Sequence, residues 1–182
     1  MIYKDILKQQ QPILYQVLLQ SFKKQKIPHA FLLVGKNARQ PAHFIAKSLV
    51  CENNVLACDT CNECRRIDEH KYGDFIYCNG QEETIKKPQI EYIQDQFSKS
   101  ALEGKAKIYL MENIENSTIE AMNSLLKMLE EPTAGVYAIF TCQNLNRVLP
   151  TIQSRCQVIQ LLPASQKTLR EELKKKILLK MI

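Results

Sequence analysis

An apolar run that is followed by a glycine constrains the fold of this chain most. The run, Phe31–Val34, has the length of a strand, and Gly35 follows it directly. After a short loop at residues 36–41, helical periodicity begins and continues through Ala42–Val50. A strand, a glycine-led loop and a helix in this order form the scaffold of a phosphate-binding loop, in which backbone N–H groups face an anion. The sequence therefore predicts a strand–loop–helix unit of the P-loop kind.

The residues that would give such a loop its chemistry are missing. A working loop reads G-x-x-x-x-G-K-[ST], in which the lysine reaches the phosphates and the hydroxyl holds magnesium. Counted from Gly35, the last three places are taken by Gln40, Pro41 and Ala42. We therefore expect a vestigial loop, with no ATP bound in the chain's own site.

The acidic group that a P-loop ATPase needs is also altered. An active enzyme places an acidic residue at the end of a neighbouring strand, where it holds magnesium and orients water. After the apolar run Ile108–Met111, this sequence gives Glu112 and Asn113. The amide of Asn113 cannot act as a base, whereas Glu112 could still contact a metal. An ATPase with its own active site therefore stays open as an alternative.

Four of the seven cysteines follow the predicted helix closely, at positions 51, 58, 61 and 64. Thiolates at two-residue spacing can converge on one tetrahedral ion, and zinc accepts four sulfur ligands. Cys51, Cys58, Cys61 and Cys64 thus predict a structural zinc module at about residues 51–66. Two alternatives are redox-active thiols and a zinc-dependent nucleic-acid-binding module. The acidic residues between the ligands, such as Asp59, would repel phosphate.

The composition is typical of a soluble globular protein, and the sequence also indicates in which cellular compartment the protein is found. The chain has 182 residues, 45% of them hydrophobic and 24% charged, with a net charge of +6. No apolar run approaches the length of a membrane span, and the first residues contain no signal-peptide core. We therefore expect a cytoplasmic protein, in which metal binding explains clustered cysteines better than disulfides do.

Strands and helices alternate along the chain. Strands are predicted at residues 31–34, 75–78, 108–111, 137–141 and 158–162. Helices are predicted at 11–24, at 42–50, from Pro88 to near Gly104, and from a capping box at Ser117–Glu120 to Pro132. This alternation is typical of an α/β fold with a parallel five-stranded sheet that is covered by helices on both faces. A highly charged helix, predicted at residues 165–181, follows the sheet.

Several motifs together resemble a known family. They are Pro28-His29-Ala30, the broken loop, the cysteine cluster, the LLKMLEEP stretch at 125–132 and the LPTIQSRC stretch at 149–156. In combination they resemble the clamp-loader branch of the AAA+ ATPases, and within it the delta-prime subunits of bacterial DNA polymerase III. The resemblance runs from about Ile13 to Pro163. It implies an AAA+ core at residues 1–163 and, at 164–182, the first helix of a truncated lid domain, without the C-terminal collar domain.

The resemblance also implies a function. Arg155 of the SRC motif would be an arginine finger that reaches the ATP site of a neighbouring subunit, and Ser154 would position the turn. The chain would be a non-hydrolysing subunit of DNA polymerase III, in the replisome at the nucleoid. Its partners would be ATPase subunits of the gamma/tau type, the delta subunit and, through the complex, the sliding clamp and primed DNA. Without its collar domain the fragment should be monomeric. Without the resemblance, Arg155 would be expected to pair with Glu130 or Glu131.

Overall fold

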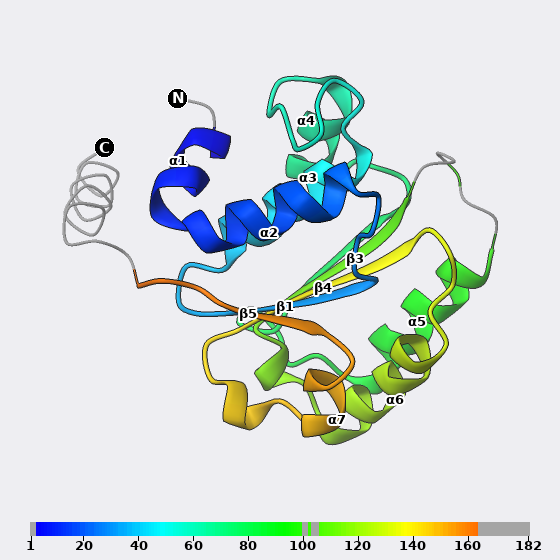
Figure 1. The fold of residues 1–182 in the computed structure, drawn as a ribbon. Helices are drawn as coiled ribbons and strands as arrows, with labels where there is room; N and C mark the ends of the chain where they lie inside the picture. Colours follow the sequence, from blue (N-terminus) through cyan, green and yellow to red (C-terminus); the bar gives the residue numbers. More distant parts are fainter. Residues whose placement is uncertain (1–2, 100–101, 103–105, 164–182) are drawn as a thin grey trace, which may run out of the picture.

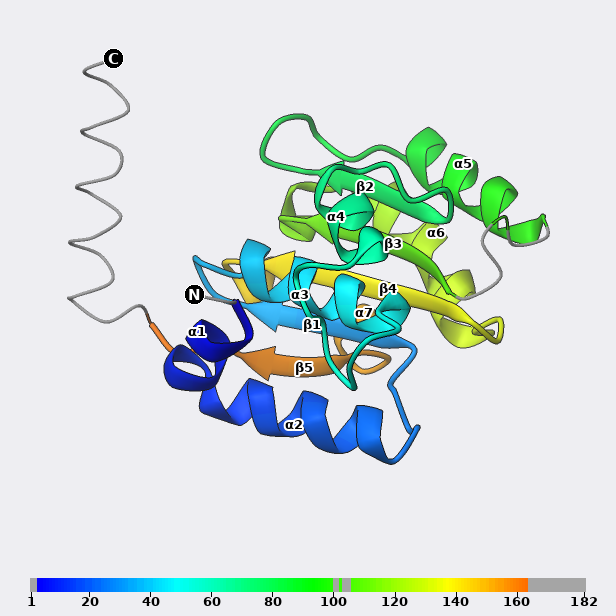
Figure 2. The ribbon, with the colours of Figure 1, turned by 90° about the horizontal axis from the view of Figure 1, so that it is seen from above.

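Five parallel strands form one sheet at the centre of the computed structural model, which describes residues 3–99, 102 and 106–163. The strands are β1 (Ala30–Val34), β2 (Phe75–Asn79), β3 (Lys107–Glu112), β4 (Val136–Cys142) and β5 (Gln157–Gln160). Their order across the sheet is β2-β3-β4-β1-β5, which Figure 2 shows from above. The predicted parallel sheet is confirmed, although β5 ends at Gln160 rather than at residue 162.

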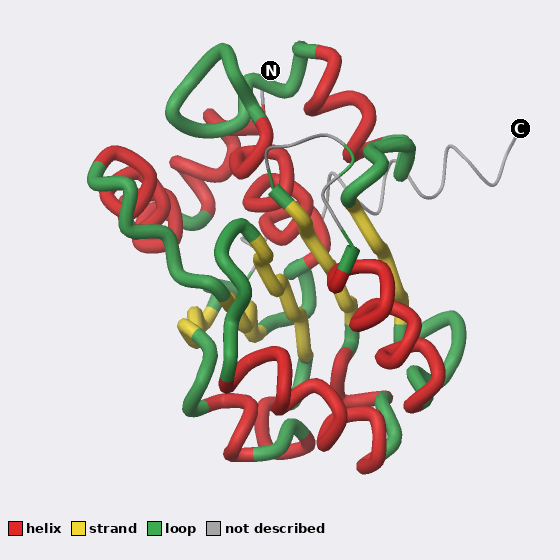
Figure 3. Tube along the Cα trace, turned by 90° about the vertical axis from the view of Figure 1, so that its right-hand side faces the viewer, coloured by secondary structure: helices red, strands yellow, loops and turns green. Residues whose placement is uncertain are grey.

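Helices cover both faces of the sheet, as predicted (Figures 1 and 3). One face carries α1 (Tyr3–Gln10), α2 (Pro12–Lys23), α3 (Arg39–Val50) and α4 (Asn62–Asp68). The other carries α5 (Lys87–Ser98), α6 (Ile119–Glu130) and α7 (Pro150–Gln153), with the 3-10 turns η1 (Ile114–Asn116) and η2 (Leu145–Arg147) in the connections. Within the described ranges, no helix has both the length and the apolar character that a membrane span requires.

The alternation of side chains along each strand builds two separate cores. Phe31 and Leu33 of β1 pack in the cluster beneath α1–α4, whereas Leu32 and Val34 pack in the cluster beneath α5–α7. All five residues of β1 are buried, because a central parallel strand has helices on both sides. This burial on both faces explains why its sequence reads as a continuous apolar run.

Some predicted boundaries differ from the observed ones. Helix α3 begins at Arg39 rather than at Ala42, because Pro41 falls in its first turn, where a backbone N–H is not needed. The capping box at Ser117 is wrong by one residue: Thr118 is the N-cap of α6, and its hydroxyl accepts a hydrogen bond from the N–H of Ala121 at 3.2 Å.

Three further helices differ from the prediction or lie outside the described residues. Helix α5 ends at Ser98 rather than near Gly104. Helix α1 was not predicted at all, and the helix predicted at residues 165–181 lies outside the described residues.

The side chain of a buried lysine caps the C-terminal end of α5 by donating hydrogen bonds to carbonyl oxygens. The ammonium of Lys107, a residue that is only 7% exposed, donates to the carbonyl oxygens of Phe97, at 3.0 Å, and Lys99. Carbonyls at a helix C-terminus lack intrahelical partners and favour a positive charge.

Lys107→Met, which keeps the apolar stem and removes the donor, should lower the free energy of unfolding by about 1.5–3 kcal/mol. Denaturant unfolding measures the change. Lys127→Met on the exposed side of α6 is the control, and it should stay within about 0.5 kcal/mol of the parent chain. Equal effects of the two substitutions would contradict the role given to Lys107.

Candidate functional site

The four clustered cysteines converge in the structure as the sequence predicted. Their Sγ atoms all lie within 4.8 Å of one another. Cys51 follows the last turn of α3, Cys58 lies in the loop, and Cys61 and Cys64 are at the start of α4. Two elements of secondary structure and the loop between them thus hold one set of thiols.

Backbone N–H groups point at two of these sulfurs. The N–H of Cys61 donates to Cys58 Sγ at 3.3 Å, and the N–H of Cys64 donates to Cys61 Sγ at 3.4 Å. Hydrogen bonds from backbone N–H groups, first that of Thr60 and then that of Cys61, lower the pKa of the Cys58 thiol to about 6, whereas burial raises the pKa of the Cys61 and Cys64 thiols. Donors of this kind stabilise thiolates, which are the form that binds metals.

The donor set fits a tetrahedral metal ion. Zn–S bonds of about 2.3 Å place four sulfurs roughly 3.8 Å apart, a small contraction of the observed cluster. Four sulfur ligands leave no open coordination position, so an ion here would be structural. None of the seven cysteines forms a disulfide.

The predicted phosphate-binding loop has the right backbone at its start. Gly35 has φ +148° at the carboxyl end of β1, and its N–H donates to the carbonyl oxygen of Cys142 at 2.9 Å. A Cβ at this position would lie 3.2 Å from the Cβ of Leu161. Positive φ and close approach together require a glycine here.

The following turn has lost backbone donors as well as side chains. Gln40, Pro41 and Ala42 lie in the first turn of α3. Proline has no N–H, and the N–H of Ala42 donates to the carbonyl oxygen of Ala38 at 3.0 Å within the helix. Ala42 is fully buried, so a methyl group packs in the core where the hydroxyl of a working loop would hold magnesium.

The acidic residue at the end of β3 lies beside two basic side chains of α3. Glu112 is 5% exposed, and its Oε1 lies 3.5 Å from Nε of Arg39 and 3.4 Å from Nε2 of His43. Asn113 follows with φ 53°, and its N–H donates to Oγ1 of Thr141 at 3.0 Å. Side chains of α3 therefore occupy the surroundings of Glu112 that a magnesium ion would need.

The pocket between these residues is small. It has a volume of about 180 Å³ and is lined by residues that include Gly35, Lys36, Arg39, Glu112 and Asn113. Pockets for small molecules and cofactors usually measure about 300–1,000 Å³. A larger hollow of about 370 Å³ lies to one side, between α1, α3 and α4.

Arg155 lies in the turn between α7 and β5. Its Nη2 is 2.7 Å from Glu130 Oε1, and its Nη1 donates to the carbonyl oxygen of Thr151 at 2.9 Å. Ser154 donates from Oγ to the same carbonyl at 3.1 Å, so both residues of the motif tie the turn to α7. The side chain of Arg155 remains 33% exposed. The pairing with Glu130, expected in the absence of any family resemblance, is therefore present.

The predicted loop residues and Arg155 lie at opposite ends of the parallel strands. Gly35, Glu112 and Asn113 are at the carboxyl ends of strands, whereas Arg155 comes just before β5, whose first residue pairs with Phe31 at the amino end of β1. The five residues of β1 span about 16 Å. An arginine at the amino ends of the strands cannot reach a phosphate that is held at their carboxyl ends in the same molecule.

Sequence reasoning missed the partners of Glu112. Arg39, His43 and Lys47 recur at intervals of four on α3, a spacing that places side chains on one face of a helix. This row of basic side chains was a usable signal. It indicates a helix that faces acidic groups, which Glu112, Asp59 and Asp68 provide.

Comparisons with known proteins give consistent results. The sequence model of the family described as DNA polymerase III, delta subunit, matches residues 10–165. The chain is 35% identical to DNA polymerase III subunit delta' of Bacillus subtilis over 90% of this chain and 51% of that protein. It is 29% identical to DNA polymerase III subunit tau of Salmonella typhimurium over 81% of this chain and 24% of that protein. The chain thus spans about half the length of the Bacillus relative.

Two solved structures from Thermotoga maritima share the fold. A DNA polymerase III gamma subunit-related protein aligns with a TM-score of 0.57 at 18% identity, over 84% of this chain and 46% of that chain. The Holliday junction branch migration motor RuvB aligns with a TM-score of 0.58 at 14% identity, over 96% of this chain and 51% of that chain. At these identities the likeness concerns the fold alone.

Proposed function

The chain belongs to the delta-prime family of bacterial DNA polymerase III subunits and has the AAA+ fold, and we propose that it is a clamp-loader subunit that does not hydrolyse ATP itself. In this proposal it donates Arg155 to the ATP site of a neighbouring ATPase subunit. The guanidinium forms two parallel hydrogen bonds to phosphate oxygens and stabilises the charge that spreads over the γ-phosphate in the transition state.

The observation that carries the proposal is the position of Arg155 at the amino ends of the parallel strands. The chain's own phosphate-binding loop lies at the carboxyl ends of the strands, one strand length away. A phosphate that meets this guanidinium must therefore come from another molecule.

The contact with Glu130 does not prevent this role. The Glu130 side chain is 50% exposed, and ion pairs between exposed groups contribute only about 0–1 kcal/mol. A γ-phosphate that carries more charge and offers more acceptor oxygens than one carboxylate can replace Glu130 as the partner of the guanidinium. Until then, the pair holds the Arg155 guanidinium beside Glu130 of α6.

The altered loop supports the absence of hydrolysis in the chain's own site. Pro41 and Ala42 remove the lysine, the hydroxyl and one backbone donor, while Arg39 and His43 surround Glu112. The partners in this proposal are ATPase subunits of the gamma/tau type and the delta subunit, and the assembled complex loads the sliding clamp onto primed DNA in the cytoplasm. Cys51, Cys58, Cys61 and Cys64 hold a structural zinc ion. In this proposal the AAA+ core spans residues 1–163, and the lid assigned to residues 164–182 lies outside the described residues.

A titration with a fluorescent ATP analogue tests the proposal on the purified chain. In magnesium buffer we expect no saturable binding, since the pocket is small and lacks the phosphate-binding lysine. A gamma-type ATPase subunit serves as the positive control in the same buffer. Tight, magnesium-dependent binding by this chain would contradict the vestigial loop, and ATP turnover by the purified chain would then show an ATPase with its own site.

A further inference from the structure

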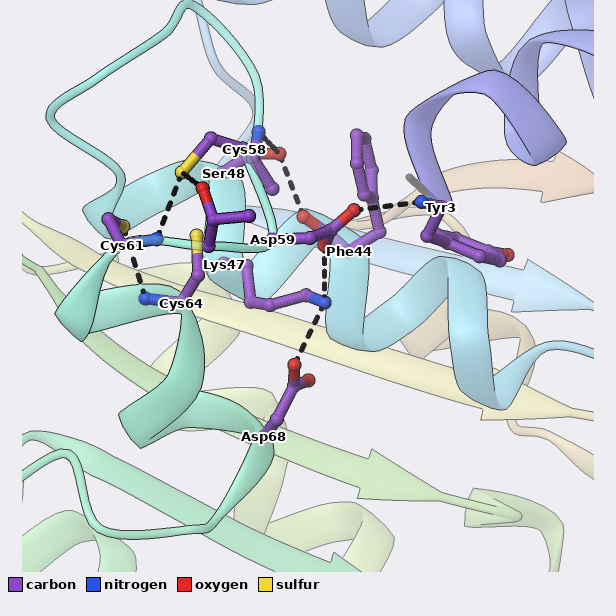
Figure 4. A network of polar contacts seen from close by, with 11 residues as sticks. Tyr3, Phe44, Lys47, Ser48, Cys58, Asp59, Cys61, Cys64 and Asp68 are labelled. Carbon is purple, nitrogen blue, oxygen red and sulfur yellow. Dashed lines mark hydrogen bonds and ion pairs between the residues drawn. The ribbon is translucent and has the colours of Figure 1, made fainter. Parts of the chain in front are cut away.

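Asp59 connects the cysteine cluster to the rest of the molecule (Figure 4). It follows Cys58 directly and precedes Cys61 by two residues, and its φ of 61° lies in the left-handed region. Aspartate tolerates this conformation at some cost, so the neighbouring residues must hold it in place. A metal ion bound to Cys58 and Cys61 fixes the backbone on both sides of Asp59.

The carboxylate of Asp59 contacts two other elements. Oδ2 accepts a hydrogen bond from the backbone N–H of Tyr3 at 3.0 Å, at the start of α1. Oδ1 accepts one from Nζ of Lys47 on α3 at 2.6 Å, and the same Nζ donates to Asp68 at 3.1 Å. The Lys47 side chain is only 8% exposed, so the two carboxylates compensate a charge that water hardly reaches.

Helix α1 depends on contacts of this kind. It has eight residues, and isolated helices of this length are not stable in water. Its apolar attachments include the buried side chain of Leu7 and the ring of Tyr3, whose centroid lies 5.7 Å from that of Phe44. A charged acceptor at its first N–H also interacts favourably with the helix dipole.

We propose that Asp59 acts as a metal-dependent latch: when the four cysteines hold a metal ion, its carboxylate fixes α1 against α3. The latch is defined as the carboxylate of Asp59 with its partners Tyr3 and Lys47. This inference rests on the proposed zinc site and adds a conformational role to it. Loss of the ion frees the backbone around Asp59, withdraws the carboxylate from Tyr3, and so weakens the attachment of α1 to α3.

The consequence extends to the point where the chain leaves the sheet. Gln11 joins α1 to α2, and its side-chain amide both accepts from the N–H of Leu162 and donates to its carbonyl oxygen, each at 2.8 Å. Leu162 follows β5 by two residues. The metal site thereby influences, through α1 and Gln11, the position of Leu162.

Hydrogen exchange of the full chain, combined with a zinc assay on the same samples, tests the latch. With zinc bound, Asp59→Gly should raise the exchange rates of the α1 amides and of the Leu162 amide roughly tenfold. Glycine keeps the left-handed backbone and removes only the carboxylate. Asp68→Ala is the matched control, because it removes the other partner of Lys47, leaves Tyr3 bound to Asp59 and should preserve protection of α1.

Removal of zinc with a chelator then distinguishes the latch hypothesis from the hypothesis of the metal site on which it depends. Removing zinc should raise α1 exchange more in the wild-type chain than in Asp59→Gly, in which the latch is already open. Equal factors in the two proteins, or full protection of α1 in zinc-bound Asp59→Gly, would overturn the latch and leave the zinc site intact. A wild-type chain that takes up no zinc would instead refute the metal site on which the latch depends.

Discussion

With Arg155 replaced by alanine, the ATP site next to this subunit is expected to hydrolyse ATP more slowly by a factor on the order of 10³. This is the lower end of what an arginine finger supplied in trans contributes to GTP hydrolysis. The loss follows because Arg155 is the one group of this chain that is proposed to reach the γ-phosphate from the amino ends of the strands. The measurement is single-turnover hydrolysis by an assembled clamp loader in which only the neighbouring ATP site is intact.

Three further variants make this result specific. Arg155→Lys keeps the charge but loses the two-pronged donor, and it should recover only a small part of the rate. Arg147→Ala removes an exposed arginine from the same crossover between β4 and β5, at η2, and should leave the rate unchanged. Glu130→Gln releases Arg155 from its pair and should not slow hydrolysis.

An unchanged rate in Arg155→Ala, with the subunit still incorporated into the complex, would exclude the finger. Incorporation must be measured for each variant, since a subunit that fails to assemble would also slow hydrolysis. Among the described residues, the hydrogen bonds of the Arg155 side chain go to Glu130, Thr151 and Ser154, all near the surface. Its replacement should therefore leave the fold intact.

The sheet could be predicted from the sequence because its signals are local. The apolar runs that became β1 and β3 are continuous since both faces are buried, and Gly35 and Pro132 mark where an element must end. The convergence of the cysteines was likewise contained in the spacing of Cys58, Cys61 and Cys64. In each case residues close in sequence determine the structure.

The features that escaped prediction depend on contacts between distant segments. Ser117 and Thr118 both carry a capping hydroxyl, and the choice between them reflects a pairing with another loop, in which the N–H of Thr118 donates to the carbonyl oxygen of Ile85 at 2.9 Å. Helix α1 has few apolar residues and gains its order by docking. The approach of Arg39 to Glu112 joins two strand ends that only the assembled sheet brings together.

Removing zinc is expected to destabilise the chain by at least about 4 kcal/mol, which is what a ligand at a thousand times its dissociation constant contributes. A zinc ion held by the four cysteines would link the end of α3, the loop and the start of α4, and Leu56, Ala57 and Cys64 of this region are fully buried in the core. Thermal or denaturant unfolding, with a chelator and then with zinc restored, measures the change. A reductant must be present throughout, so that chelation does not lead to disulfides.

A pair of cysteine variants distinguishes a metal site from a cluster of ordinary thiols. Cys64→Ser removes a ligand at a fully buried position, and its unfolding midpoint should no longer respond to zinc. Cys78→Ser alters a half-buried thiol of β2 outside the cluster, and this variant should keep about one zinc per chain and the full response. If the wild-type chain unfolds at the same midpoint with and without the chelator, the four thiols are not a structural metal site. The stability of this region must then come from its apolar contacts alone.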